Sequence, residues 1–171
     1  FKFFDRKEVK DVLAYARLAA NHYDDEALFR IINFPRRGIG EASIDKIADY
    51  ARHTGRSAYD VVVDPTSAPA LKNKLVDLGM TLKDLSEKAN GDAAGFFKHL
   101  LFNVLDVVGL FSDDDDGEAR LENLNELIAS VKDFVKNNPS ATVSDYLQTV
   151  SLYSDTDDMG DDDCVTLATV H

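Results

Sequence analysis

The residues best suited to chemistry stand together in one segment, from Phe34 to Lys46. It contains a Gly-Ile-Gly turn, and glycines allow both a tight turn and the close approach of a ligand to the backbone. A helix expected after the turn begins with unpaired N–H groups at its positive dipole end, where a phosphate oxygen is a favourable ligand. The apolar Ile39 is expected to point inward and hold the turn on the core. The residues predicted to form a phosphate-contacting site are Arg36, Arg37, Gly38, Ile39, Gly40, Ser43 and Lys46.

The charge distribution favours this interpretation over a plain connector between two helices, although that connector stays open as an alternative. The net charge is −12, but residues 112–171 carry 15 acidic and three basic residues and account for the whole excess. Residues 30–56 carry six Lys or Arg against three Asp or Glu. Because the local potential decides whether a phosphate backbone can dock, the net charge does not exclude nucleic acid.

Other reactive residues form no recognisable site. The sequence has no Gly-Lys dipeptide, so the phosphate-binding loop G-x-x-x-x-G-K-[ST] is absent. A calcium loop beginning at Asp155 fails, because Met159 occupies a ligand position and Thr166 replaces the bidentate Glu. We therefore expect no catalytic residue, no metal site and no cofactor in this chain. The histidines, which lack metal-ligand spacing with one another or with Cys164, are His22, His53, His99 and His171.

The length and the apolar spacing predict one all-α domain. With 171 residues, 44% of them hydrophobic, the chain can build a sizeable core, and no apolar run is long enough to span a membrane. The most apolar stretch, 93–111, is predicted to be a single central buried helix. Ser144 is expected to cap the last helix. A helix is predicted between Asp25 and Pro35 and another between Gly40 and Gly55. The other predicted helices are 6–20, 57–63, about 69–78, about 81–90, 93–111, about 118–137 and 144 to about 152.

The two ends do not fit a helical body. Phe1–Phe4 is a short apolar run, and Val165–Val170 is β-branched and strand-like. Isolated strand edges would expose unpaired backbone groups. We therefore expect an insertion whose parent protein supplies the neighbours of these strand-like stubs.

Five segments, in order along the whole chain, resemble motifs of the UvrD/PcrA/Rep-type superfamily 1 DNA helicases. The segment Phe3–Tyr15 is similar to F-F-x-R-x-E-[IV]-K-D-x-x-[AS]-Y, and Phe29–Gly40 is similar to R-[IV]-[IV]-N-x-P-x-R-G-[IV]-G. Arg120–Leu127 resembles R-x-E-N-[IL]-x-E-[FL], and Tyr146–Leu152 resembles F-L-x-x-x-x-L. Val165–His171 looks like the start of V-T-L-M-T-x-H-x-A-K-G-L-E-F.

The resemblance implies the 2B subdomain of such a helicase, inserted in its second RecA-like domain, 2A. Residues 1–20 would be a stub of 2A, 21–160 the helical subdomain, and 161–171 the return strand. The implied fold is an irregular multi-helix domain with a helix-hairpin-helix-like element. In the family this subdomain swivels and touches duplex DNA through its Gly-Ile-Gly hairpin. The implied contacts fall on Arg37, Gly38, Ile39 and Gly40, with Arg36 and Ser43 beside them.

The implied parent is a bacterial-type, cytoplasmic, ATP-dependent 3′–5′ DNA helicase of repair or replication, with ATP and Mg²⁺ bound outside this chain. The chain itself would be a non-catalytic regulatory module. Its partners would be the duplex DNA backbone, read without sequence preference, its own motor domains, and accessory proteins. No membrane partner is expected. The alternative function is a protein–protein interaction module that uses the acidic C-terminal third.

Overall fold

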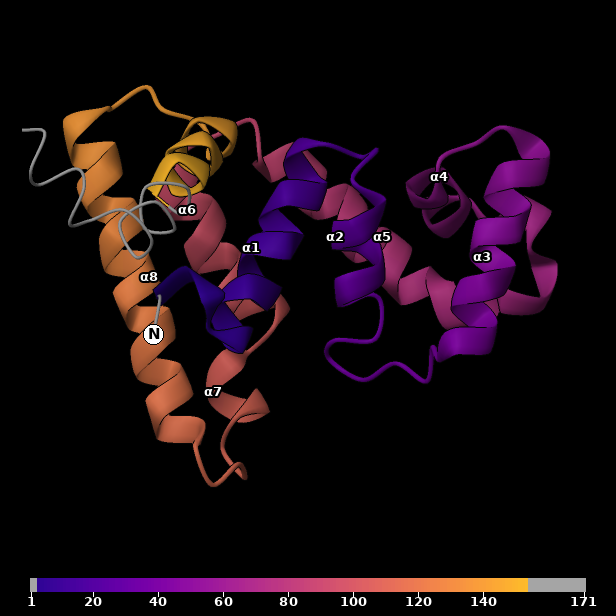
Figure 1. Cartoon of the computed structure of the whole chain (residues 1–171), viewed down its shortest axis with the longest axis horizontal. Helices are drawn as coiled ribbons and strands as arrows, with labels where there is room; N and C mark the ends of the chain where they lie inside the picture. Colours follow the sequence, from indigo (N-terminus) through magenta and orange to yellow (C-terminus); the bar gives the residue numbers. More distant parts are fainter. Residues whose placement is uncertain (1–2, 154–171) are drawn as a thin grey trace, which may run out of the picture.

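The computed structural model describes residues 3–153, apart from the side chain of Ser67. All regular structure in this part of the chain is helical, which confirms the all-α prediction (Figure 1). The α-helices are α1 (Lys7–Ala20), α2 (Asp25–Ile31), α3 (Glu41–Thr54), α4 (Ala58–Val63), α5 (Lys72–Lys88), α6 (Ala93–Lys98), α7 (Val107–Leu110) and α8 (Gly117–Asn137). The other helical segments are the 3-10 turns η1 (Phe3–Asp5), η2 (Pro65–Ser67) and η3 (Pro69–Leu71), the π-helix η4 (His99–Val104), and residues 143–153.

The first long helix, α1, lies at the centre of an elongated molecule. It packs against α2 and α5 on one side and against α8 on the other. In Figure 1, α3 and α4 lie at one end of the long axis, and α7 and α8 lie toward the other. Ten of the 14 residues of α1 are buried. The division of the chain at residue 20 stays a prediction, but α1 belongs to the same packed body as α2 and α5. None of the described helices is long and apolar enough to cross a membrane.

Polar side chains on and beside α1 join segments that are far apart in the sequence. Arg6 donates a hydrogen bond to the side-chain oxygen of Asn123 on α8, and the Asn123 amide donates to the Glu8 carboxylate. The Asp11 carboxylate accepts from Nε of Arg30 on α2 at 2.8 Å. Glu8 and Asp11 are 8% and 5% exposed, so these bonds satisfy polar groups that burial would otherwise destabilise. The segments that carry the helicase resemblance are thus bonded to one another.

The prediction of two helices at 69–78 and 81–90 was wrong, because one continuous helix, α5, replaces them. Gly79 lies in its interior, where an added Cβ would lie 3.0 Å from the carbonyl oxygen of Val62 and 3.2 Å from Cα of Val63. The missing side chain lets α5 approach α4 closely, and the apolar spacing continues on both sides of it. The buried residues of this helix are Leu75, Leu78, Gly79, Leu82 and Leu85.

The single helix predicted for 93–111 was also wrong, because the segment is divided into α6, η4 and α7. Asp106 adopts a left-handed backbone conformation with φ of 46°, which ends the preceding helical segment. Its side chain accepts a hydrogen bond from the Gly109 N–H at 3.3 Å and so caps α7. The segment is not wholly buried either, since Phe102 is 47% and Val108 58% exposed.

Both ends of the described chain differ from the sequence predictions. Residues 3–5 form a 3-10 turn and not a strand, whereas Val165–Val170 lies outside the described residues. The last helix is capped by Thr142 and not by Ser144. The Thr142 hydroxyl accepts from the Asp145 N–H at 3.3 Å, and the Asp145 carboxylate accepts from the Thr142 N–H at 2.9 Å. This reciprocal pair is a capping box.

Candidate nucleic-acid interface

The predicted phosphate-contacting segment forms the turn between α2 and α3. Gly38 has a φ of 73°, a left-handed conformation that glycine adopts without strain. Ile39 is 1% exposed, which confirms that it points inward. Gly40 is the N-cap of α3 and has an extended backbone, with φ of −96° and ψ of −171°. The buried isoleucine therefore holds the turn on the core while a glycine on each side leaves the outer face of the turn bare.

Asn33, itself exposed, organises this turn through its side chain. Its side-chain oxygen accepts hydrogen bonds from the N–H of Arg37 at 2.7 Å and from the N–H of Ile39 at 3.2 Å. One amide side chain thus bridges two backbone donors of the turn. The sequence analysis did not select Asn33 as a functional residue, although Asn is a residue that commonly bonds to the backbone of a turn.

The N-terminus of α3 offers backbone donors to solvent. No side chain caps this end, and the first bond of the helix runs from the Ile44 N–H to the Gly40 carbonyl at 3.0 Å. The N–H groups of Glu41, Ala42 and Ser43 precede that bond, so they have no carbonyl partner within the helix. An anion can accept hydrogen bonds here and gain from the helix dipole. The exposed carboxylate of Glu41 lies in the same turn and opposes part of that attraction.

Two of the predicted cations point into solvent. Arg36 and Lys46 are exposed, and neither has a hydrogen bond or ion pair with any residue among 3–153. Ser43, between them in the sequence, is half-buried. Only Ile47 of α3 is buried, so most of this helix is accessible. These cations therefore flank the uncapped helix end and can take phosphate contacts without breaking an internal bond.

Arg37 is placed differently, because its guanidinium points into the protein. Nη1 donates to the carbonyl oxygens of Ile31 at 2.9 Å, Ile32 at 3.3 Å and Phe34 at 3.0 Å. Nη2 donates to the hydroxyl of Tyr15 on α1 at 2.7 Å. Arg37 thus satisfies carbonyl groups at the C-terminal end of α2, where a positive charge also complements the helix dipole.

Tyr15 is the second residue that the sequence analysis missed. Its side chain is fully buried, and its hydroxyl donates to the Phe34 carbonyl while it accepts from Arg37. Burial raises the pKa of Tyr15 above the ordinary 10.0, against a smaller opposing effect of the Arg37 charge, so the hydroxyl keeps its proton. Twenty-two residues separate the pair, and no local pattern in the sequence could connect them.

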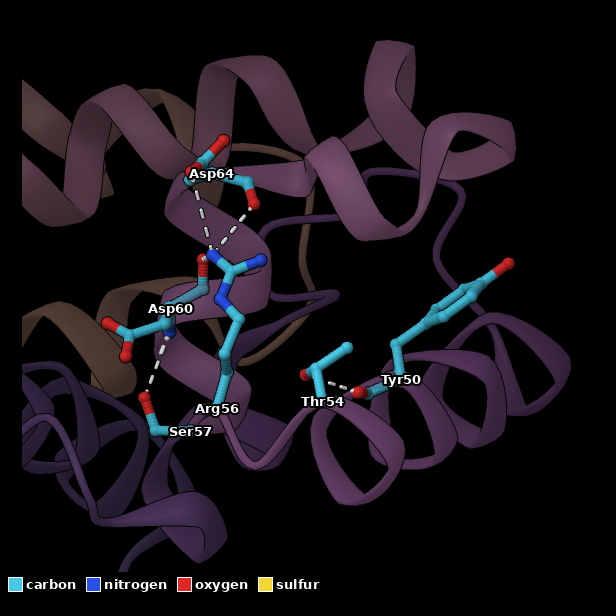
Figure 2. A network of polar contacts seen from close by, with 6 residues as sticks. All are labelled: Tyr50, Thr54, Arg56, Ser57, Asp60 and Asp64. Carbon is cyan, nitrogen blue, oxygen red and sulfur yellow. Dashed lines mark hydrogen bonds and ion pairs between the residues drawn. The ribbon is translucent and has the colours of Figure 1, made fainter.

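The remaining cations of the basic segment 30–56 have partners elsewhere. Arg30 is bonded to Asp11, and Arg52 forms an ion pair with Asp49. Figure 2 shows the Arg56 guanidinium turned toward α4, where Nη2 donates to the carbonyls of Asp60 at 2.7 Å and Asp64 at 2.9 Å. The cations of the segment that have no partner among the described residues are therefore fewer than its composition indicates. They are Arg36 and Lys46.

The described part of the acidic region lies away from this turn. The residues from Ser112 to Asp116 are exposed and join α7 to α8, below α7 in the view of Figure 1 and away from α3. Arg120 pairs with Asp114 at 3.2 Å and with Asp116 at 3.1 Å, which neutralises part of the cluster. Among the described residues, no group of three or more acidic, His or Cys side chains could hold a metal ion.

Comparison with known proteins gives the family of this chain. The sequence profile of the UvrD-like helicase C-terminal domain matches residues 1–171. This chain belongs to that family. The ATP-dependent DNA helicase PcrA of Staphylococcus epidermidis is 34% identical over 179 residues, covering 99% of this chain and 24% of the relative. The protein of the same name from Staphylococcus aureus is 32% identical over 178 residues, with the same coverages.

Membership in the UvrD-like helicase family confirms the coarse interpretation of the five sequence segments. The chain spans about a quarter of the length of the curated relatives it matches. The two segments that Arg6 and Asn123 join both lie within the residues that the family profile matches.

Proposed function

We propose that this chain is the 2B subdomain of an ATP-dependent 3′–5′ DNA helicase of repair or replication, and that it contacts duplex DNA without catalysing a reaction. The observation that carries the proposal is the exposed turn between α2 and α3. There Arg36 and Lys46, which have no partner in the described part of the chain, flank the uncapped N-terminus of α3. Membership in the UvrD-like helicase family supports it.

The contact is made to the DNA backbone. A phosphate at the start of α3 accepts hydrogen bonds from the free N–H groups beside Gly40, while Arg36 and Lys46 attract neighbouring phosphates. Ser43 adds a hydroxyl donor. Contacts of this kind fix the position of the duplex and carry no base information, so binding is independent of sequence. With so few contacts on an acidic chain, we expect a Kd of roughly 10⁻⁴ M or weaker at physiological salt.

Unwinding itself needs the motor domains of the parent protein. The chain has no Gly-Lys dipeptide, so its residues do not fit the phosphate-binding loop of an ATP site, and we assign ATP and Mg²⁺ to those domains. The subdomain holds the duplex while the motor pulls one strand. Rotation as a rigid body about its two connections switches unwinding on and off. Because α1 packs against α2, α5 and α8, we place the N-terminal pivot before Lys7.

Fluorescence anisotropy of a labelled duplex, measured at low and moderate salt, tests the DNA contact. Arg36→Ala is expected to weaken binding and to lower the salt slope by about 1, because one phosphate contact is lost. Arg52→Ala is the matched control, since it also removes one exposed arginine, at the opposite end of α3. It is expected to bind as the wild type does. The proposal fails if the wild type does not bind at low salt, or if both variants lose equal affinity.

A second candidate function is protein binding by the acidic region. Its support is the exposure of the stretch Ser112–Asp116, in which Asp113 and Asp115 have no ion pair with any residue in the described range. A basic protein surface is the complementary partner. Asp113→Asn/Asp115→Asn should abolish capture of such a partner and leave duplex binding unchanged. Loss of duplex binding with unchanged capture would contradict this second function.

A further inference from the structure

The contacts of Arg37 engage Nη1 and one N–H group of Nη2 within the protein. Three carbonyl oxygens surround Nη1, at 2.9, 3.0 and 3.3 Å, and the Tyr15 hydroxyl lies 2.7 Å from Nη2. The carbonyls belong to the last residues of α2 and to the turn that follows. To bind a phosphate, the guanidinium would have to leave these acceptors, although the Ile31 carbonyl also accepts from the Phe34 N–H and the Phe34 carbonyl from the Tyr15 hydroxyl. That exchange would cost the hydrogen bonds that shape the turn.

The geometry of these bonds requires an arginine. A guanidinium is planar and presents several N–H groups in fixed directions, so one side chain can bond to carbonyls on successive residues and to a hydroxyl at the same time. A lysine ammonium carries the same charge but cannot reproduce that fork. At a simple phosphate contact, in contrast, lysine retains most of the attraction. The two roles therefore respond differently to the same conservative substitution.

Tyr15 connects this cluster to the centre of the fold. Its hydroxyl bonds to both Arg37 and the Phe34 carbonyl, and its ring is fully buried on α1. One and two turns earlier on the same helix, Asp11 and Glu8 are bonded to α2 and α8. The turn that carries the exposed phosphate donors is thus held by a helix that is itself held on both sides.

We propose that Arg37 is a positioning residue of the DNA-contacting turn and that Tyr15 is its anchor on α1, so that neither residue touches phosphate. This inference rests on the function proposed above and divides the adjacent arginines into two roles. Arg36 binds the DNA backbone, and Arg37 holds the backbone amides and Arg36 in place. It also assigns Tyr15 a part in DNA binding, although Tyr15 lies beneath the surface that the duplex would contact.

Paired conservative substitutions in the full chain test the proposal by duplex anisotropy at low salt. Arg36→Lys is expected to lose less affinity than Arg36→Ala, because the charge is kept. Arg37→Lys is expected to lose about as much affinity as Arg37→Ala, roughly tenfold, because neither restores the fork. Tyr15→Phe is expected to lose about three- to tenfold, although it removes no charge.

Tyr59→Phe is the matched control for Tyr15→Phe. The Tyr59 hydroxyl also donates to a backbone carbonyl, that of Leu82 at 3.3 Å, and its side chain is 4% exposed. This variant also removes the hydroxyl of a buried tyrosine, on α4 and away from the turn, and is expected to bind DNA as the wild type does. Equal losses in both tyrosine variants would assign the effect to global stability and overturn the proposal.

Amide hydrogen exchange gives a readout that does not depend on DNA. The Ile39 N–H, bonded to Asn33 at 3.2 Å, is expected to exchange faster in Arg37→Lys and Tyr15→Phe, and at the wild-type rate in Arg36→Lys and Tyr59→Phe. If Arg36→Ala weakens binding while Arg37→Lys binds normally and leaves this exchange unchanged, the positioning role is wrong and the DNA contact stands. If the exchange pattern is as expected but the wild type does not bind duplex, the proposed function is wrong, and with it the part of Arg37 in DNA binding.

Discussion

The Asp11 carboxylate on α1 accepts a hydrogen bond from Nε of Arg30 on α2 at 2.8 Å, with the Asp11 side chain 7% exposed and that of Arg30 33%. Burial raises the pKa of Asp11 above the ordinary 3.8, and the Arg30 charge and hydrogen bond act in the opposite direction. The arginine is thus what makes a buried carboxylate tolerable at this position. Since α2 leads directly into the exposed turn, this pair also fixes where that turn begins.

Arg30→Ala is expected to destabilise the fold by about 2–3 kcal/mol, because it leaves a buried carboxylate without its charged partner. Without the arginine the pKa of Asp11 rises further, so the folded state binds a proton more readily than the unfolded state. The free energy of unfolding of this variant should therefore increase as the pH is lowered toward the raised pKa. Urea unfolding at neutral pH and at about pH 5 measures both effects. The prediction is wrong if Arg30→Ala lowers the free energy of unfolding no more than Arg52→Ala does at both pH values.

The decrease in the free energy of unfolding at low pH should depend on Asp84, which links α5 to η4. Its carboxylate accepts from Nζ of Lys88 at 2.6 Å and pairs with Nε2 of His99 at 2.7 Å. These hydrogen bonds lower the pKa of Asp84 below 3.8. A carboxylate with a lowered folded-state pKa contributes stability above its unfolded value, and that contribution is lost as the pH falls through the folded value.

Asp84→Asn should therefore lower the free energy of unfolding at neutral pH, by an amount that disappears as the pH falls through the lowered pKa of the Asp84 carboxyl. Urea midpoints of the wild type and the variant, followed from about pH 6 downward, give this difference directly. The two curves are expected to converge at the acidic end. Curves that stay parallel over the whole range would show that the carboxylate's charge contributes nothing.

Gly117, the first residue of α8, should tolerate no side chain. An added Cβ would lie 2.0 Å from the carbonyl oxygen of Phe111, a backbone atom that cannot move alone. Gly117→Ala is expected to lower the free energy of unfolding by about 1–3 kcal/mol or more, as other overpacked substitutions do. Gly91→Ala is the control, because its Cβ would meet only the Lys88 carbonyl at 3.5 Å, and a change within about 0.5 kcal/mol is expected. Equal unfolding midpoints for the two variants would contradict the close approach at Gly117.

Local patterns predicted most of the fold. The apolar stripe at 118–137 predicted α8 within one residue of its start, and Gly55, left-handed with φ of 68°, ends α3 as expected. The failures arose where a distant contact decides the conformation. Gly79 does not break α5, because the absence of a side chain lets α4 pack closely against the helix there. That packing is not visible in the sequence around residue 79.

The candidate site divides in the same way. The position of Ile39 and the left-handed Gly38 follow from the Gly-Ile-Gly pattern itself, and the structure has both. The different orientations of Arg36 and Arg37 do not follow from it, because adjacent arginines carry the same local signal. What separates them is Tyr15, whose hydroxyl reaches Arg37 from another helix. A count of charges in a segment therefore overstates how many are available to a ligand.

Gly38 and Gly55 provide a matched pair of variants that separates the stability of the chain from DNA binding. They have similar left-handed φ angles, 73° and 68°, and an added Cβ would meet nothing within 4 Å at either position. Replacement by alanine should therefore cost each variant a similar amount, about 1 kcal/mol of backbone strain. Gly38 lies in the proposed DNA-contacting turn, whereas Gly55 lies at the opposite end of α3.

Gly38→Ala is expected to weaken duplex binding, because relief of the strain changes the path of the turn and displaces Arg36 from the N–H groups of α3. Gly55→Ala, whose thermal stability is expected to equal that of Gly38→Ala, should bind duplex as the wild type does. The measurement is duplex anisotropy on both variants at a temperature well below their common unfolding midpoint, so that both are fully folded. If the two lose affinity equally, the effect belongs to the stability of the chain and the turn is a simple connector. A loss confined to Gly38→Ala means that the backbone path between α2 and α3 is what holds the phosphate donors in place.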